Sequence, residues 1–310
     1  MVELNGKKIL VTFLMHLGDL TLTTPFIHAL RKAAPDAHIT MLVDEKLKDV
    51  VLFNPYLDEV VTIDKKGRDN SILSLWACSR HLSKLDFDVL INLHPNERCS
   101  FIDAMTSVKL RTGTTHKIFK WFWDVFTPLD RSMHAADMYL DVLQQLGVQN
   151  LSNNGLEIFP GEEHFLEAEL FWQEQNITDQ DKLIGFNIGS AVPTKRWPPE
   201  RFAEVADIFA AKGYKTVFFG GPMDEEMVAE ATGYMQTRPI IATGHFAIGG
   251  LAAAMRRCCL IITNDSGPMH VAISQKVPIV AMYGPSNPKL YGPYTKDAVI
   301  VTAQPPCQGC

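Results

Sequence analysis

The feature that most restricts the fold is an ordered pattern near the C-terminal end of the chain. An apolar run, Cys259–Ile262, leads into Thr263–His270 (TNDSGPMH), and a second apolar run follows at Val277–Met282. This order predicts a buried parallel strand, a tight turn, a helix and another parallel strand. A helix that starts at the carboxyl end of such a strand offers unpaired N–H groups, which suit a phosphate. The alternative is that Asp265 and Ser266 only cap the helix.

The same alternation recurs along the chain and predicts two doubly wound α/β domains. Strands are expected at 7–14, 37–43, 59–63, 87–93, 183–188, 214–219, 239–242, 259–262 and 277–282. Helices are expected at 20–32, 44–53, 69–83, 134–146, 162–175, 200–212, 223–233, 248–256 and 269–274. The polar, glycine-containing stretch 151–161 is interpreted as the linker. The predicted domains are therefore 1–155 and 156–310.

Composition narrows the class of protein. The 310 residues carry a net charge of −6, which argues against nucleic acid as the partner. No apolar run reaches the roughly 18 residues of a membrane span. The first residues do not have the shape of a signal peptide, and the six cysteines follow no disulfide framework. We therefore expect the protein in the cytoplasm.

The stretch 98–131 differs from the rest because basic and aromatic residues alternate in it. Such a surface suits an anionic amphiphile or a membrane headgroup layer. The alternative is a core-packing insert with a solvated face. The residues concerned are Arg98, Lys109, Arg111, Lys117, Lys120 and Arg131, with Phe119, Trp121, Phe122, Trp123 and Phe126.

Three motifs in the chain's order and spacing resemble one family. They are His16-Leu17-Gly18-Asp19 with Thr23-Thr24-Pro25; Asn187-Ile188-Gly189-Ser190 with Lys195-Arg196-Trp197-Pro198 and Arg201-Phe202; and Asn264–His270 with Tyr283-Gly284-Pro285-Ser286-Asn287-Pro288. Together, over about residues 7–301, they resemble the bacterial ADP-heptose:lipopolysaccharide heptosyltransferases of glycosyltransferase family 9. The resemblance implies a GT-B fold, in which two Rossmann-like domains face across a cleft. It also implies inverting transfer of heptose from ADP-heptose, held by the C-terminal domain, to the lipopolysaccharide inner core, held by the N-terminal domain.

The resemblance identifies Asp19 as the catalytic base. Inversion at a sugar carbon requires a group that takes the proton of the attacking acceptor hydroxyl, and a carboxylate can do so. The alternative is that Asp19 caps a helix starting at Leu20. Gly18 would let the backbone approach the substrate, or would only form a tight turn. His16 has a weaker case, since a lone histidine at a strand end is more often structural.

Lys195 matches the lysine of the family that contacts the phosphates of the nucleotide sugar. A fixed cation there would stabilise the charge of the departing diphosphate; the alternative is a solvated loop lysine. Arg196 is a weaker second candidate. Ser190, after Gly189, matches a hydroxyl position near the phosphates, and Thr194 offers another hydroxyl in the same loop.

The segment Thr263–His270 would supply further contacts to the donor substrate, ADP-heptose. Ser266 and the N–H groups from Gly267 onward would bind the diphosphate or the sugar hydroxyls. Asp265 repels phosphate, so the resemblance implies contact with the sugar hydroxyls of the donor. His270, one helical turn beyond Ser266, is a modest candidate.

Asp224 and Glu225 match the region where the family binds the ribose. A carboxylate there can accept hydrogen bonds from two ribose hydroxyls. The alternative, that both only stabilise a helix N-terminus, stays open.

The sequence predicts no metal site and no cofactor beyond the donor. Asp-x-Asp is absent, so Lys195 and the helix terminus would neutralise the diphosphate. Cys307 and Cys310 have metal-like spacing but make only half of a zinc or iron site. The resemblance also implies a further C-terminal helix, which suggests that the sequence is truncated.

Other functions remain open from the sequence. The chain can be a family 9 transferase with another donor or a protein acceptor. It can also be a non-catalytic protein that binds sugar nucleotides. Peripheral contact with the cytoplasmic face of the inner membrane agrees with the stretch 98–131.

Overall fold

The computed structural model describes residues 2–302 and divides the chain into two compact domains, with the boundary between Asn154 and Gly155. The two terminal cysteines, Cys307 and Cys310, lie outside the described residues.

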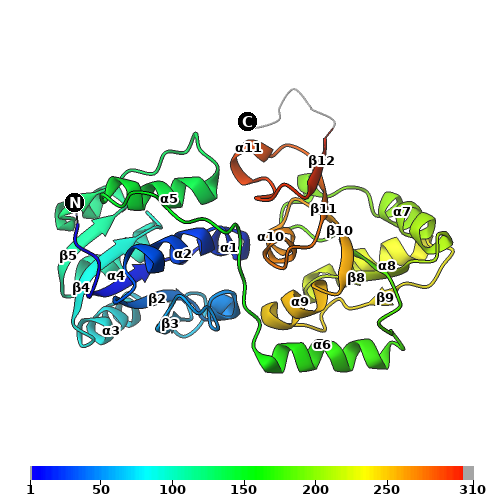
Figure 1. Cartoon of the computed structure of the whole chain (residues 1–310), viewed down its shortest axis with the longest axis horizontal. Helices are drawn as coiled ribbons and strands as arrows, with labels where there is room; N and C mark the ends of the chain where they lie inside the picture. Colours follow the sequence, from blue (N-terminus) through cyan, green and yellow to red (C-terminus); the bar gives the residue numbers. More distant parts are fainter. Residues whose placement is uncertain (1, 303–310) are drawn as a thin grey trace. The chain divides into compact units, whose positions relative to one another are not determined.

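The N-terminal domain is built on a parallel six-stranded sheet (Figure 1). Its strands are β1 (Lys8–Thr12), β2 (His38–Asp44), β3 (Glu59–Ile63), β4 (Phe87–Asn92), β5 (Val108–Gly113) and β6 (Val125–Phe126). Its helices are α1 (Leu17–Thr21), α2 (Thr24–Ala33), α3 (Ile72–Ser83), α4 (Glu97–Met105) and α5 (Ala135–Gln145), with 3-10 turns η1 (Glu45–Val50) and η2 (Lys117–Phe122). The strands lie in the order β3-β2-β1-β4-β5-β6.

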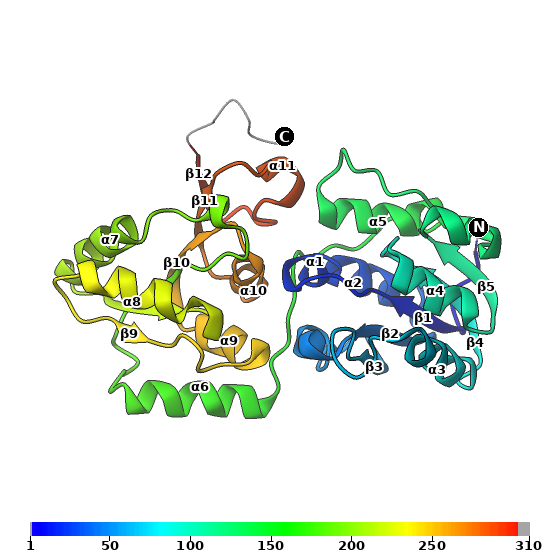
Figure 2. The same ribbon diagram turned by 180° about the vertical axis from the view of Figure 1, so that it is seen from behind.

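Both faces of this sheet are covered, which explains why its central strands are apolar throughout. Helices α3 and α4 pack together on one face and α2 and α5 on the other (Figures 1 and 2). The core between the sheet and the α3–α4 layer includes Leu10, Leu90 and Ile102, all fully buried.

The C-terminal domain repeats this design. Its strands are β7 (Leu183–Asn187), β8 (Lys215–Phe219), β9 (Ile240–Ile241), β10 (Cys258–Asn264), β11 (Ile279–Tyr283) and β12 (Ala298–Thr302). Its helices are α6 (Glu162–Glu174), α7 (Pro199–Ala211), α8 (Glu225–Tyr234), α9 (Ile248–Met255), α10 (Gly267–Ser274) and α11 (Pro288–Tyr291), with 3-10 turns η3 (Pro193–Lys195) and η4 (Pro222–Asp224). The parallel strands lie in the order β12-β11-β10-β7-β8-β9, and Phe186 stacks on Phe218 in the core beneath α7 and α8.

The two sheets have the same topology. Numbered within its own domain, each runs 3-2-1-4-5-6, which is the order of a Rossmann sheet. In such a sheet the order in which successive strands are added reverses between strands 1 and 4. Ligands bind outside the carboxyl ends of these two strands. The expected sites are therefore the ends of β1 and β4 in the first domain and of β7 and β10 in the second. The predicted fold of two Rossmann-like domains is confirmed.

Two predicted helices are wrong, and so is the interpretation of the stretch 98–131 as an insert. The helix expected at 20–32 is two helices, because Pro25 lacks an N–H and starts α2 afresh, while the Thr23 hydroxyl donates to the Leu20 carbonyl at 2.7 Å. The helix expected at 44–53 is only the 3-10 turn η1. The stretch 98–131 is part of the Rossmann domain, since it contains most of α4 and all of β5 and β6.

Candidate active site

Asp19 lies in the first turn of α1, just beyond the carboxyl end of β1. The helix begins earlier than the sequence predicts, with His16 as its N-cap residue, so the alternative that Asp19 caps it is wrong. The dipole of the helix favours a carboxylate in this first turn. Gly18 is the second residue of α1 and its carbonyl accepts from the Leu22 N–H at 3.0 Å, so it forms no tight turn.

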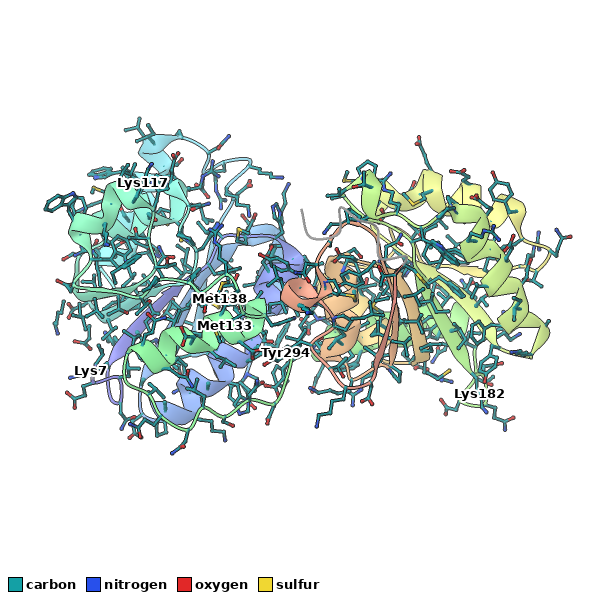
Figure 3. All side chains as sticks on the ribbon, turned by 90° about the horizontal axis from the view of Figure 1, so that it is seen from above. Lys7, Lys117, Met133, Met138, Lys182 and Tyr294 are labelled. Carbon is teal, nitrogen blue, oxygen red and sulfur yellow. The ribbon has the colours of Figure 1, made fainter. Side chains whose placement is uncertain are left out.

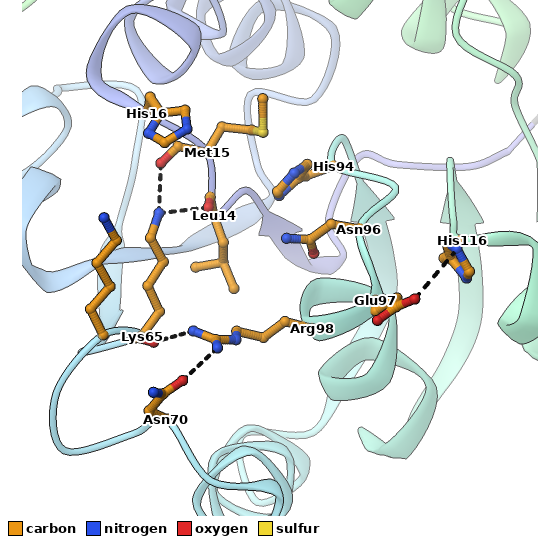
Figure 4. A pocket seen from close by; sticks show the side chains of 11 residues that line it. Leu14, Met15, His16, Lys65, Asn70, His94, Asn96, Glu97, Arg98 and His116 are labelled. Carbon is orange, nitrogen blue, oxygen red and sulfur yellow. Dashed lines mark hydrogen bonds and ion pairs between the residues drawn. The ribbon is translucent and has the colours of Figure 1, made fainter. Parts of the chain in front are cut away.

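A pocket of about 820 Å³ opens at the carboxyl ends of β1 and β4 and beside the loop after β3 (Figure 4). This is where the Rossmann topology predicts a ligand. Its lining is rich in basic side chains: Lys65, Lys66, Arg98, His16, His94 and His116. The pocket therefore favours a ligand that is negatively charged or rich in hydroxyls.

His94 is a pocket residue that the sequence reasoning did not single out. Its side chain is buried, and its Nδ1 has no hydrogen-bond partner among the described residues. Burial, with the nearby charges of Lys65 and His16, lowers the pKa of His94 to about 4. The imidazole is thus neutral at pH 7 and can hydrogen-bond to a ligand hydroxyl. Its position directly after β4 was the signal that could have identified it.

Beneath the pocket lies a buried polar cluster. The Thr12 hydroxyl, at the end of β1, donates to Asp103 Oδ2 at 2.8 Å, and Cys99 Sγ lies 3.8 Å from the same oxygen. Burial raises the pKa of Asp103 to about 8, although both hydrogen bonds favour the carboxylate. The carboxyl group therefore ties α4 to the end of β1 mainly in its protonated form at neutral pH.

This cluster predicts a stability that falls with pH. An unfolded Asp has a pKa of about 3.9, so above pH 4 the unfolded chain loses the proton that folded Asp103 retains until about pH 8. The free energy of unfolding should therefore fall between pH 4 and pH 8. We expect Asp103→Asn, which keeps an acceptor oxygen, to be the more stable protein at pH 8 by on the order of a few kcal/mol. Urea unfolding at pH 5 and pH 8 measures this, and identical pH dependence in both proteins would refute the assignment.

In the C-terminal domain, polar side chains join the carboxyl ends of β7 and β10. Asn187, the last residue of β7, donates through Nδ2 to Thr263 Oγ1 at 3.1 Å and to Ser266 Oγ at 2.8 Å. Ser266 is the N-cap residue of α10, but its side chain makes no capping hydrogen bond. Ser266 thus occupies the expected N-cap position without capping through its side chain, and a ligand role for Asp265 and Ser266 stays a prediction. Sequence reasoning also missed Asn187 as a site residue, although it ends a buried strand.

Lys195 and Asp265 form an ion pair at the start of α10. Lys195 Nζ lies 2.7 Å from Asp265 Oδ2, and the two side chains are 29% and 6% exposed. The carboxylate is thus buried while the ammonium stays open to solvent. The loop after β7 folds over this pair, since the Ser190 hydroxyl donates to the Asp265 carbonyl at 3.4 Å and Arg196 Nε to the Ser190 carbonyl at 2.8 Å.

The ion pair borders a cavity of about 400 Å³, whose lining includes Lys195, Arg196, Trp197 and Tyr283. The hydroxyl of Tyr283 donates to the Tyr291 carbonyl at 3.0 Å. Burial and the neighbouring Asp265 charge raise the pKa of Tyr283, so the phenol stays protonated at neutral pH. Two cations, an indole ring and a neutral phenol are groups that can bind part of an anionic, polyhydroxylated ligand.

Asp224 is held close to the loop that follows β7. Its Oδ2 accepts from the Gly221 N–H at 2.9 Å. A Cβ atom on Gly189 would lie 2.2 Å from Asp224 Oδ1, so only glycine fits beside this carboxylate. Glu225 is the exposed first residue of α8. Both acidic groups therefore stand at a helix start, and a ribose contact stays a prediction.

The structure thus gathers some predicted residues and separates others. Ser190, Lys195, Asp265 and Ser266 lie together, with Gly267 opening α10 behind them. Thr194, exposed on η3, lines the same cavity as Lys195. His270 is buried inside α10.

Comparison with known proteins identifies the family. The model of glycosyltransferase family 9 (heptosyltransferase) matches residues 75–310. Lipopolysaccharide heptosyltransferase 3 of Escherichia coli K12 is 24% identical, over 91% of this chain and 84% of its own length. A crystal structure of a family 9 glycosyl transferase from Veillonella parvula is 56% identical and covers 98% of this chain and 89% of that chain, with a TM-score of 0.96. The structure of E. coli ADP-heptose lipopolysaccharide heptosyltransferase II has a TM-score of 0.82 at 23% identity, over 95% of this chain and 90% of its own.

Within residues 2–302 no group of three or more His, Cys, Asp or Glu side chains could hold a metal ion. A more distant fold neighbour, TibC of enterotoxigenic E. coli, is described as an iron-containing glycosyltransferase; it is 13% identical with a TM-score of 0.57. The absence of a metal from this chain's reaction stays a prediction.

No helix in residues 2–302 is long and apolar enough to cross a membrane.

The family model spans well over half of the sequence and includes the whole C-terminal domain with its ion pair. The chain therefore belongs to glycosyltransferase family 9, the heptosyltransferase family, and is a glycosyltransferase.

Proposed function

We propose that this chain transfers heptose from ADP-heptose to the inner core of lipopolysaccharide, with inversion at the anomeric carbon. Residues 1–155 would bind the acceptor and 156–310 the donor. The names of its relatives support both substrates, since one is a lipopolysaccharide heptosyltransferase and a similar fold is that of an ADP-heptose transferase. We also propose that it works at the cytoplasmic face of the inner membrane.

The observation that carries the proposal is the partly open Lys195 ammonium at the N-terminus of α10. A fixed cation and the unpaired N–H groups of a helix start both bind phosphate oxygens. The donor diphosphate would lie here, with further contacts from Gly189, Ser190 and Thr194 and from the Gly267 backbone. Asp265 and His270 would serve the sugar, and Asp224 and Glu225 the ribose.

Asp19 would act as the base. As the acceptor oxygen attacks the anomeric carbon, its proton passes to the Asp19 carboxylate. The bond from that carbon to the diphosphate oxygen breaks, and ADP leaves with the electron pair. Lys195 and the start of α10 would stabilise this leaving charge without a metal ion.

The acceptor would occupy the basic pocket of the N-terminal domain. The exposed Lys66 ammonium and the imidazoles of its lining suit the acidic groups of a lipopolysaccharide core better than a neutral protein hydroxyl. An apolar and basic surface stands beside the pocket, because η2 follows the pocket residue His116 directly. On η2 the side chain of Trp121 is 95% exposed, next to Lys120. Lys117, on the same turn, and Lys7 lie at separate corners of this domain (Figure 3).

We therefore propose that η2 contacts the membrane that holds the acceptor. Trp121→Ser should weaken binding to anionic lipid vesicles about tenfold, since one interfacial tryptophan buries a large amphipathic ring. Met223→Ser, at a 94% exposed apolar position of the other domain, is the matched control and should bind normally. Co-sedimentation with vesicles measures both, and equal binding by the two variants would exclude this surface.

The whole proposal is tested by incubating the chain with ADP-heptose and either deacylated lipopolysaccharide core or protein. We expect heptosylated core whose anomeric configuration is opposite to that of the donor, by NMR, and unchanged activity in EDTA. Calorimetric titration should show binding of ADP and not of UDP. Transfer only to protein, or binding of UDP alone, would contradict the proposed acceptor or donor.

A further inference from the structure

The loop after β3 carries a basic tract, Lys65-Lys66-Gly67-Arg68, at the wall of the N-terminal pocket. Such a tract suggests three cations ready for an anionic ligand. The contacts of Lys65 are different. Its Nζ donates to the carbonyls of Leu14 and Met15, both at 2.8 Å (Figure 4). It also lies 3.0 Å from Asp44 Oδ2.

These three contacts use all of the donors of an ammonium group. The side chains of Lys65 and Asp44 are also only 12% and 6% exposed. Lys66 is exposed and has no such set of partners among the described contacts. Lys65 is therefore committed within the protein, and a ligand would have to break a buried ion pair to use it.

The two carbonyls are at a particular place in the chain. Leu14 and Met15 connect β1 to His16, the N-cap residue of α1, and α1 carries Asp19 in its first turn. Asp44 is the last residue of β2, the strand paired with β1. Lys65 thus fastens the segment that leads into α1 to the end of a neighbouring strand.

The backbone of Lys65 is held in place as well. Its backbone carbonyl accepts from Arg98 Nη1, and Arg98 Nη2 donates to Asn70 Oδ1 at 2.6 Å. Arg98 is the second residue of α4, directly after β4. The loop 64–70 is therefore held both by the segment after β1 and by α4, which follows β4. The ends of β1 and β4 are where the topology predicts the ligand.

We propose that Lys65 is a positioning residue for sugar transfer: by fixing the Leu14 and Met15 carbonyls against Asp44, it sets the position of α1 and hence of the Asp19 carboxylate. This inference rests on the proposed role of Asp19 as the base. An error of about 1 Å in the placement of a reacting group can cost about a hundredfold in rate. The effect should therefore fall on kcat and not on substrate binding.

The experiment compares Lys65→Met, Asp44→Asn and the control Lys48→Met, at an exposed lysine of η1 outside the lining of the pocket. We expect Lys65→Met to lower kcat about a hundredfold and Asp44→Asn about tenfold, with KM for both substrates within threefold. Lys48→Met should leave kcat and both KM values within twofold. If Lys65→Met raised the acceptor KM and spared kcat, Lys65 would be a ligand-binding cation and the proposal would be wrong.

A double-mutant cycle separates this inference from the proposed function. If Lys65 acts through Asp19, adding Lys65→Met to Asp19→Asn should lower the residual rate by less than threefold. A full hundredfold further loss would show that Lys65 acts elsewhere. If Asp19→Asn alone left transfer intact, the proposed base would fail whatever Lys65 does. Should Lys65→Met not fold, Asp44→Asn supplies the same test through the partner carboxylate.

Discussion

Replacing Asp19 with Asn should lower kcat about a thousandfold, within the range of about 10²–10⁴ that a positioned general base contributes. Asn keeps the size and polarity of the side chain but cannot accept the proton of the attacking hydroxyl. Donor affinity should stay within threefold, since under the proposed function the donor contacts lie in the other domain. Single-turnover transfer with saturating ADP-heptose measures the chemical step directly.

The control for Asp19 is Asp36→Asn. Asp36 is an exposed carboxylate of the same domain, placed before β2 and hydrogen-bonded to Asn5 at 3.0 Å. It should leave turnover within twofold. Normal transfer by Asp19→Asn would mean that another group takes the proton.

Replacing Lys195 with Met should lower kcat/KM by about 10²–10³, which is the loss measured when one donor to a developing charge is removed. Unlike Asp19, Lys195 should also affect binding of the diphosphate. We therefore expect weaker binding of ADP by calorimetry together with slower transfer. Lys212→Met, which removes a lysine lying over Phe209, is the matched control.

A second variant separates catalysis from stability. Lys195→Met leaves the Asp265 carboxylate buried without its cation, so the protein should also melt at a lower temperature. Adding Asp265→Asn removes that charge and should restore most of the melting temperature. It should not restore transfer. Recovery of transfer in the double variant would show that Lys195 acts only by neutralising Asp265.

Most of the fold could be predicted from the sequence because its central strands are buried on both faces and therefore carry apolar runs. β1 and β10 are such strands. The helices between long strands could be predicted as well. β5 was missed because Lys109 and Arg111 alternate with apolar residues, which concealed it in a basic stretch. The helix break before Pro25 was missed because Leu22 and Phe26 kept the helical spacing on both sides of it.

The candidate site was predictable in part. Motif residues that follow a strand, such as Lys195 and Ser266, could be found because topology brings strand ends together. Their mutual contacts could not, since the pairing of Lys195 with Asp265 joins residues seventy positions apart. The basic tract after β3 misleads for a similar reason: its charges are visible in the sequence, but the buried acceptors of Lys65 are not.

The Lys195–Asp265 ion pair has a consequence for turnover under the proposed function. The ammonium that would hold the donor already has a partner fixed 2.7 Å away in the same domain. That carboxylate is present at a high effective concentration and competes with ADP for the lysine at the end of every cycle. An internal competitor of this kind weakens the hold on the spent nucleotide, and so it favours product release over product inhibition.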